Sequence, residues 1–133
     1  MRILLLADIH ANWPALQAIQ EPHDVCLFLG DLVDYGLEPG PCIDWVRRNT
    51  HLAVRGNHDH GMAQNVILGA RPNGFKHLTA MTRSLTRGQI NEADLRYLSG
   101  LPPTRMATLE NTRILMVHAT PRDPLDEYAP NDP

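Results

Sequence analysis

Cysteine and positive charge are both scarce in this chain of 133 residues. The two cysteines, Cys26 and Cys42, are too few for a disulfide scaffold and do not form a Cys-x-x-Cys pair. Lys and Arg number 12 against 15 Asp and Glu, so the formal net charge is -3. Because phosphate backbones attract basic surfaces, this balance argues against a general nucleic-acid or membrane-surface binder. A local positive site, such as a pair of metal ions, remains compatible with it.

Long apolar runs and a secretory leader are missing as well. No run is long enough to span a bilayer. The chain opens on Met1-Arg2 and then enters a short apolar run, without the basic segment and long apolar core of a signal peptide. We therefore expect a cytoplasmic protein with no membrane partner. The length and the 43% hydrophobic content suit a single soluble domain over residues 1–133.

Short apolar runs without alternation predict strands that are covered on both faces, as in a parallel sheet between helices. They are Ile3–Ala7, Val25–Leu29, Leu52–Val54 and Ile114–Val117. Helices are expected after the capping residue Asn12, from Pro41 to Arg48, and after the capping residue Asn91. We expect mixed helix and loop over residues 60–90, and a loop in the tail after Asp123. The alternation of strand and helix predicts a layered α/β domain.

Each apolar run is followed by a side chain that can bind a metal ion. In an open α/β sheet, ligands bind beyond the carboxyl ends of the strands. Asp8 and His10 are two positions apart, so on a strand both would point to one face and hold one ion. Asp31 offers two oxygens that can bridge two ions, Asn57 a neutral oxygen, and His118 an imidazole. This mixed set favours two divalent ions, Mn, Fe, Zn or Ni, over calcium.

His58 and Asp34 form the expected catalytic pair. His58 follows the ligand Asn57 directly and is free to protonate a leaving oxygen, while Asp34 can bond to its imidazole and fix the tautomer. Asn57, His58 and Arg55 are the candidate substrate-binding residues, although a structural ion pair is an equally good interpretation of Arg55. Asp59 is expected to be structural, capping the segment that follows it.

Taken together, the motifs closely resemble those of the calcineurin-like metallophosphoesterases. The matching segments are Asp8-x-His10, Gly30-Asp31-x-x-Asp34, Gly56-Asn57-His58-Asp59 and the strand-end His118. The resemblance implies a layered α/β calcineurin-like sandwich, with Asp8, His10 and Asp31 at one ion. It implies Asp31, Asn57 and His118 at the other ion. The sequence is most similar to the small bacterial phosphodiesterase and dinucleoside-polyphosphatase-like branch.

Two features depart from that family. Tyr35 stands where its phosphoprotein phosphatases carry a phosphate-gripping Arg, which argues against a Ser/Thr phosphatase. The family also ends its site with a Gly-His-x-His segment, whereas no histidine follows His118 in this chain. We therefore expect a C-terminally truncated fold, the N-terminal portion of a longer enzyme, with an exposed sheet edge that favours homo-oligomers. A second chain lending the missing histidines is the alternative.

The leading hypothesis is a metal-dependent phosphoesterase that hydrolyses phosphomonoester or phosphodiester bonds. Metal-bound hydroxide would attack phosphorus in line, and His58 would protonate the departing oxygen. The expected substrate is a small phosphorylated molecule such as a nucleotide or phosphodiester. The alternative is a non-catalytic metallophosphoesterase-like module that binds a partner, inactive because metal ligands are missing.

Overall fold

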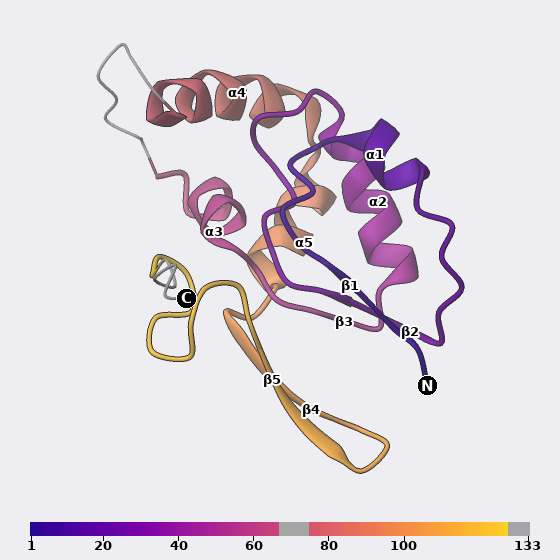
Figure 1. Ribbon diagram of the computed structural model, residues 1–133. Coiled ribbons are helices and arrows are strands. Elements are labelled where there is room, and N and C mark those ends of the chain that lie inside the picture. The colour runs from indigo at the N-terminus through magenta and orange to yellow at the C-terminus, as the bar shows by residue number, and fades with distance from the viewer. Residues whose placement is uncertain (67–74, 128–133) are drawn as a thin grey trace.

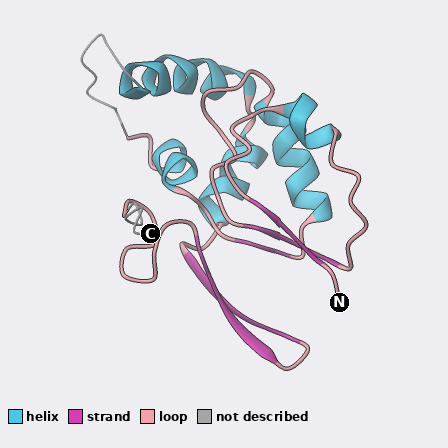
Figure 2. Cartoon of the chain, viewed as in Figure 1, coloured by secondary structure: helices cyan, strands magenta, loops and turns pink. Residues whose placement is uncertain are grey.

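The computed structural model describes residues 1–66 and 75–127. The chain folds into a parallel sheet, helices that pack against it, and a β-hairpin (Figures 1 and 2). The strands are β1 (Ile3–Leu6), β2 (Val25–Phe28), β3 (Leu52–Ala53), β4 (Thr104–Leu109) and β5 (Thr112–Val117). The helices are α1 (Trp13–Gln17), α2 (Pro39–Asn49), α3 (Asn57–Ala63), α4 (Phe75–Gln89) and α5 (Glu92–Gly100). The predicted layered α/β class is confirmed.

The first three strands form a parallel sheet in the order β1-β2-β3. Phe28 of the central strand packs into the main core with side chains from α1, α2 and α5, so the helices cover one face. Leu27 points to the opposite face, where it packs with Val54, which follows β3, and with Met116 of the β4–β5 hairpin. The hairpin therefore covers the second face only near β2 and β3.

The prediction that every strand is covered on both faces is wrong for β1. Leu5 pairs with Leu27 in register, yet its side chain is 58% exposed, and Ile3 is 42% exposed. Only the helix side of β1 is covered, where Leu6 packs against the core. The hairpin does not cover the other face of this edge strand in the part of the chain that the structure describes.

The fourth predicted strand was also placed in the wrong sheet. It forms β5, which pairs antiparallel with β4 in a separate two-stranded sheet, from Thr104 opposite Val117 to Leu109 opposite Thr112. No strand was predicted over β4, so the partner needed for an antiparallel ladder was missing from the prediction. Figure 1 shows this hairpin extending away from the helices.

The capped helices agree with their sequence signals. The Asn12 side chain accepts the N–H of Ala15 at the start of α1, and Asn91 and Asp94 form a capping box at α5. Helix α2 begins at Pro39, two residues earlier than predicted, because Pro is well suited to the first helical turn. No helix within residues 1–66 and 75–127 is long and apolar enough to cross a membrane.

Helix α4 replaces much of the mixed helix and loop that was predicted for residues 60–90. Its buried residues are Thr79, Thr82 and Thr86. Its large apolar side chains are exposed instead, namely Phe75, Leu78, Met81 and Leu85. Residues 67–74 of the same predicted segment, and the last six residues of the predicted C-terminal loop, lie outside the described part of the chain.

Candidate metal centre

The loops that follow β1 and β2 lie side by side and are joined by main-chain hydrogen bonds. The N–H groups of Asp8 and His10 donate to the carbonyl oxygens of Gly30 and Asp31, at 2.9 and 3.0 Å. Asp8, His10 and Asp31 all have positive φ angles, of 53°, 47° and 63°. The predicted pair Asp8 and His10 therefore converges through left-handed turns beyond the strand, and not through strand alternation.

Asp59 fastens the β2 loop to the beginning of α3. Its buried carboxylate accepts the N–H groups of Asp31 and Leu32, both at 2.8 Å, and of Gly56 at 3.0 Å. Burial raises the pKa of Asp59 to about 6, the neighbouring Asp31 charge acts in the same direction, and the three N–H groups oppose both. The predicted capping role of Asp59 at this helix is confirmed.

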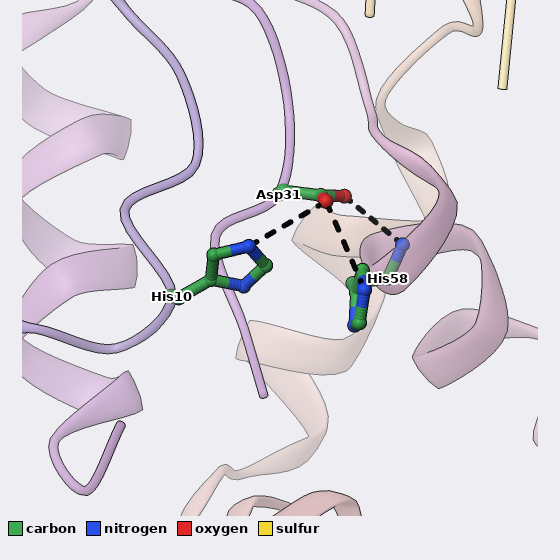
Figure 3. Close-up of side chains that lie close together, drawn as sticks. All are labelled: His10, Asp31 and His58. Carbon is green, nitrogen blue, oxygen red and sulfur yellow. Dashed lines mark hydrogen bonds and ion pairs between the residues drawn. The ribbon is translucent and has the colours of Figure 1, made fainter. Parts of the chain in front are cut away.

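The carboxylate of Asp31 lies at the centre of the site, and it is almost completely buried. Its Oδ2 atom is 3.3 Å from Nε2 of His118, 3.7 Å from Nε2 of His10 and 4.0 Å from Nε2 of His58. Its Oδ1 atom accepts the main-chain N–H of His58 at 3.0 Å. Figure 3 shows Asp31 between His10 and His58. One carboxylate thus faces three imidazoles, which come from the loop after β1, the first turn of α3 and the segment after β5.

All three imidazoles are oriented by a hydrogen bond at Nδ1. When Nδ1 carries the proton and donates it to an oxygen, the lone pair of Nε2 is available to an ion or a substrate. The partners of Nδ1 are Val33 O for His10 (2.8 Å), Leu29 O for His118 (2.9 Å) and Asp34 Oδ2 for His58 (2.8 Å). The structure therefore brings the predicted catalytic pair into direct contact.

Asp31 and His118 each shift the pKa of the other. The hydrogen bond with Asp31 raises the pKa of His118 to about 9, the Asp31 charge and the Leu29 carbonyl act in the same direction, and burial opposes them. For Asp31, burial works against ionisation, but the bond and charge of His118 outweigh it and lower the pKa. Without an ion, this pair is a carboxylate and an imidazolium.

The donor atoms are spaced for divalent ions. Those of Asp8, Asp31 and His118 lie within 4.8 Å of one another, and so do those of His10, Asp31 and His58. Ligands of a transition metal sit about 2.0–2.2 Å from it, so two ligands of one ion are about 3–3.5 Å apart. The 3.3 Å separation between Asp31 and His118 fits that geometry, and the 3.7 Å separations need only small movements. Imidazole nitrogen and carboxylate oxygen suit Mn, Fe, Zn or Ni.

These groupings differ from those that the family resemblance implied. Asp8 is grouped with Asp31 and His118, whereas His10 is grouped with Asp31 and His58. Asp8 Oδ1 also lies 3.7 Å from His10 Nε2, so it is within reach of either set. Asp31 belongs to both groups, which is the position that a bridging ligand requires. The assignment of each ligand to one ion stays a prediction.

The cluster opens into a cleft of about 360 Å³. Its lining includes every predicted metal ligand, Asn57 among them, and His58, Tyr35 and residues 125–127. Among the described residues, Arg55 does not belong to that lining, and its main-chain N–H donates to Pro102 O. The substrate-binding role of Arg55 stays a prediction. Arg122 pairs with Glu127 of that lining.

Helix α4 adds two contacts that the sequence analysis missed. Arg83 donates to the carboxylate of Asp34, with Nη2 and Oδ2 separated by 2.6 Å. Thr82 Oγ1 accepts the main-chain N–H of Tyr35 at 3.0 Å, and the Tyr35 ring packs against His10 and His58, at 4.8 and 5.1 Å between centroids. Arg83 is 49 positions from Asp34, and no local pattern signals such a contact.

A parallel sheet with Asp, Asn and His side chains at its carboxyl ends is the architecture of a metallophosphoesterase. The chain belongs to the calcineurin-like phosphoesterase family, whose model matches residues 1–132. Members of this family are hydrolases that act on phosphoesters and bind metal ions. The family and the fold class expected from the motifs are confirmed.

Individual relatives agree with this assignment. An uncharacterized protein of Methanocaldococcus jannaschii is 30% identical over 129 residues, covering 92% of this chain and 51% of that protein. A metallophosphoesterase structure from Sphaerobacter thermophilus is 32% identical with a TM-score of 0.77, covering 97% of this chain and 51% of that one. A hypothetical protein of Pyrococcus horikoshii shares the fold, at 23% identity and a TM-score of 0.80, covering 99% and 60%. The chain thus spans about half the length of the first two.

Proposed function

We propose that this protein hydrolyses a phosphate ester with two divalent metal ions and with His58 as the general acid. The observation that carries the proposal is the buried carboxylate of Asp31, whose Oδ2 lies 3.3–4.0 Å from the Nε2 atoms of three imidazoles. A purely structural histidine cluster would not need to direct the Nε2 atoms of three imidazoles at one buried carboxylate. Such an arrangement would suit a carboxylate that two ions share, with imidazole nitrogens available around it.

The residues divide the chemistry between them. Divalent ions supply positive charge to the phosphate and lower the pKa of the attacking water. After the water has lost one proton to solvent, its oxygen would bond to phosphorus while the bond from phosphorus to the leaving oxygen breaks. His58, held at Nδ1 by Asp34, donates its Nε2 proton to that oxygen. Asn57, in the same lining, offers its amide to an ion or to a phosphate oxygen.

The cleft favours a small substrate. Its volume of about 360 Å³ suits a phosphodiester or a nucleotide. Unless ions are bound, the carboxylates of its lining (Asp8, Asp31, Asp126 and Glu127) outnumber the imidazolium of His118. Binding of an anionic phosphate therefore requires the ions. We propose Mn, Fe, Zn or Ni as the metals, because the donors combine imidazole with carboxylate.

The test replaces Asp31 with Asn and measures metal-dependent cleavage of bis(p-nitrophenyl) phosphate. Asn keeps the shape but removes the charge that two ions share, so cleavage and metal content should both fall to background. Asp44→Asn is the matched control, because Asp44 is half-exposed on α2 and pairs with Arg48. An Asp31→Asn protein that keeps its metals and its rate contradicts the bridging role.

A non-catalytic binding module of the same fold is the second candidate. Metal analysis of the purified protein separates the two. Fewer than one ion per chain, without turnover of any phosphoester, supports the module, whereas about two ions with turnover supports the enzyme. Size-exclusion chromatography tests the predicted self-association in the same preparation.

A further inference from the structure

A single buried oxygen of Asp34 receives three donors. Oδ2 lies 2.8 Å from Nδ1 of His58, and 2.6 and 3.1 Å from Nη2 and Nε of Arg83. The side chain of Asp34 is 0% exposed, so no solvent stabilises its charge. A buried carboxylate is tolerated only when charged partners and hydrogen bonds compensate it. Of the two described residues whose side chains bond to Asp34, His58 and Arg83, Arg83 is the one with a permanent charge.

The position of Arg83 is built by the surrounding chain. Its side chain is 13% exposed, and a Cβ atom on Gly61 would lie 2.5 Å from Nη1, so the absence of a side chain at Gly61 makes room for the guanidinium. Thr82, the residue before it, bonds to the N–H of Tyr35, and Thr79 bonds to the Tyr35 hydroxyl at 2.9 Å. Helix α4 is therefore held against the loop that carries Asp34.

We propose that Arg83 is a positioning residue for the general-acid step, which it serves by fixing the Asp34 carboxylate that orients His58. This inference rests on the proposed function. Arg83 is not in the lining of the ion cleft, although it lines an adjoining hollow with Asn57 and His58. Its guanidinium is bonded to Asp34, so we infer that it acts through Asp34. Two of its nitrogens grip one carboxylate, which prevents rotation of that group and keeps Oδ2 aimed at Nδ1 of His58.

The consequence is a dependence on the leaving group. A general acid contributes about 10²–10⁴-fold when the leaving oxygen is basic, and little when the leaving group departs readily as an anion. A defect in His58 orientation should therefore slow diphenyl phosphate more than bis(p-nitrophenyl) phosphate, since phenolate is the more basic anion. A general loss of structure or of metal would slow both equally.

The experiment compares kcat for the two substrates in the wild type, Arg83→Met, Arg83→Lys and Arg87→Met. Arg83→Met should lose about tenfold or more on diphenyl phosphate beyond its loss on bis(p-nitrophenyl) phosphate. Arg83→Lys should recover part of that difference, because it returns a charge. Arg87, one turn along α4, is partly exposed and lies near Glu92, so Arg87→Met is the control with no selective loss. Equal losses on both substrates overturn the proposal.

A second measurement needs no turnover and separates this proposal from the proposed function. Nitrogen-15 NMR at one fixed pH reports which imidazole nitrogen of His58 carries the proton, with the signal assigned by its disappearance in His58→Gln. We expect Nδ1 of His58 to carry a proton in the wild type, whether or not Nε2 is also protonated, and we expect the signal of that hydrogen-bonded proton to be lost in Arg83→Met. An unchanged His58 signal refutes positioning by Arg83, whereas a wild type that cleaves no phosphoester refutes only the proposed function.

Discussion

Metal affinity should depend steeply on pH because a proton competes with the ion for His118. The bond with Asp31 raises the pKa of His118 to about 9, so in the ion-free protein its Nε2 is protonated at neutral pH. An ion needs the lone pair of that nitrogen, and binding must release the proton. The pKa of Asp31 is lowered, so its carboxylate stays ionised and does not change the count of protons in this range.

The size of the effect follows from the distance between the working pH and that pKa. Below pH 9 each unit of pH lowers the apparent affinity about tenfold, so at pH 7 binding should be about 100-fold weaker than at pH 9 and above. Affinity therefore rises as the pH rises, with a slope of about one proton per ion, and levels off near pH 9. This dependence belongs to the ion that His118 holds.

Isothermal titration calorimetry with Mn²⁺ at several pH values measures both the affinity and the proton released, the latter from buffers of different ionisation enthalpy. His118→Gln is the matched variant, because it removes the group whose proton competes with the ion. This variant should bind Mn²⁺ more weakly than the wild type at high pH, and its affinity should not change with pH in this range. An affinity that stays constant between pH 7 and pH 9 in the wild type would refute the reasoning. So would binding without proton release at pH 7.

Further predictions concern stability and the loops. Asp59→Asn should cost about 2–4 kcal/mol in urea unfolding, since the amide offers one acceptor oxygen to three N–H groups. Because the pKa of Asp59 is raised to about 6 from 3.8, its contribution to the free energy of unfolding should fall by about 2 kcal/mol as pH rises from 4 to 6. Asp59→Asn should not show this pH dependence. Gly56→Ala should reduce metal binding, since its Cβ would lie 2.0 Å from Asp31 Oδ1, whereas Gly88→Ala meets no atom within 4 Å and should stabilise by about 0.5–1 kcal/mol. Met116→Ala should cost about 2–5 kcal/mol, because Met116 joins the hairpin to the sheet.

Chain order explains why the predicted metal ligands could be found from the sequence. The ends of parallel strands meet at one edge, so polar residues directly after β1, β2 and β3 must converge. The fourth ligand-bearing strand was assigned to the same sheet wrongly, yet His118 still reaches the site, where its ring bonds to Leu29 O. The hairpin therefore delivers His118 to the correct edge by packing against the sheet and not by joining it.

The contacts made by α4 could not be predicted from the sequence, because this helix exposes its apolar residues and buries polar ones. Apolar residues at helical spacing, such as Leu78, Met81 and Leu85, predict a buried face, but all three are exposed. The threonines pack inward instead, and Thr82 bonds to the Asp34–Tyr35 turn.

A buried polar face is stable only where its hydroxyl groups form hydrogen bonds with specific partners. Those partners cannot be predicted without knowing where the helix packs. That docking is what sets Arg83 beside Asp34, since Arg83 follows Thr82 directly and the bond from Tyr35 N–H to Thr82 Oγ1 fixes the helix register. A shift of α4 by one residue would move the guanidinium about 1.5 Å along the axis and about 100° around it, away from Asp34. The proposed general-acid pair, His58 and Asp34, is thus found from local sequence motifs, while its orientation depends on a long-range contact between polar groups.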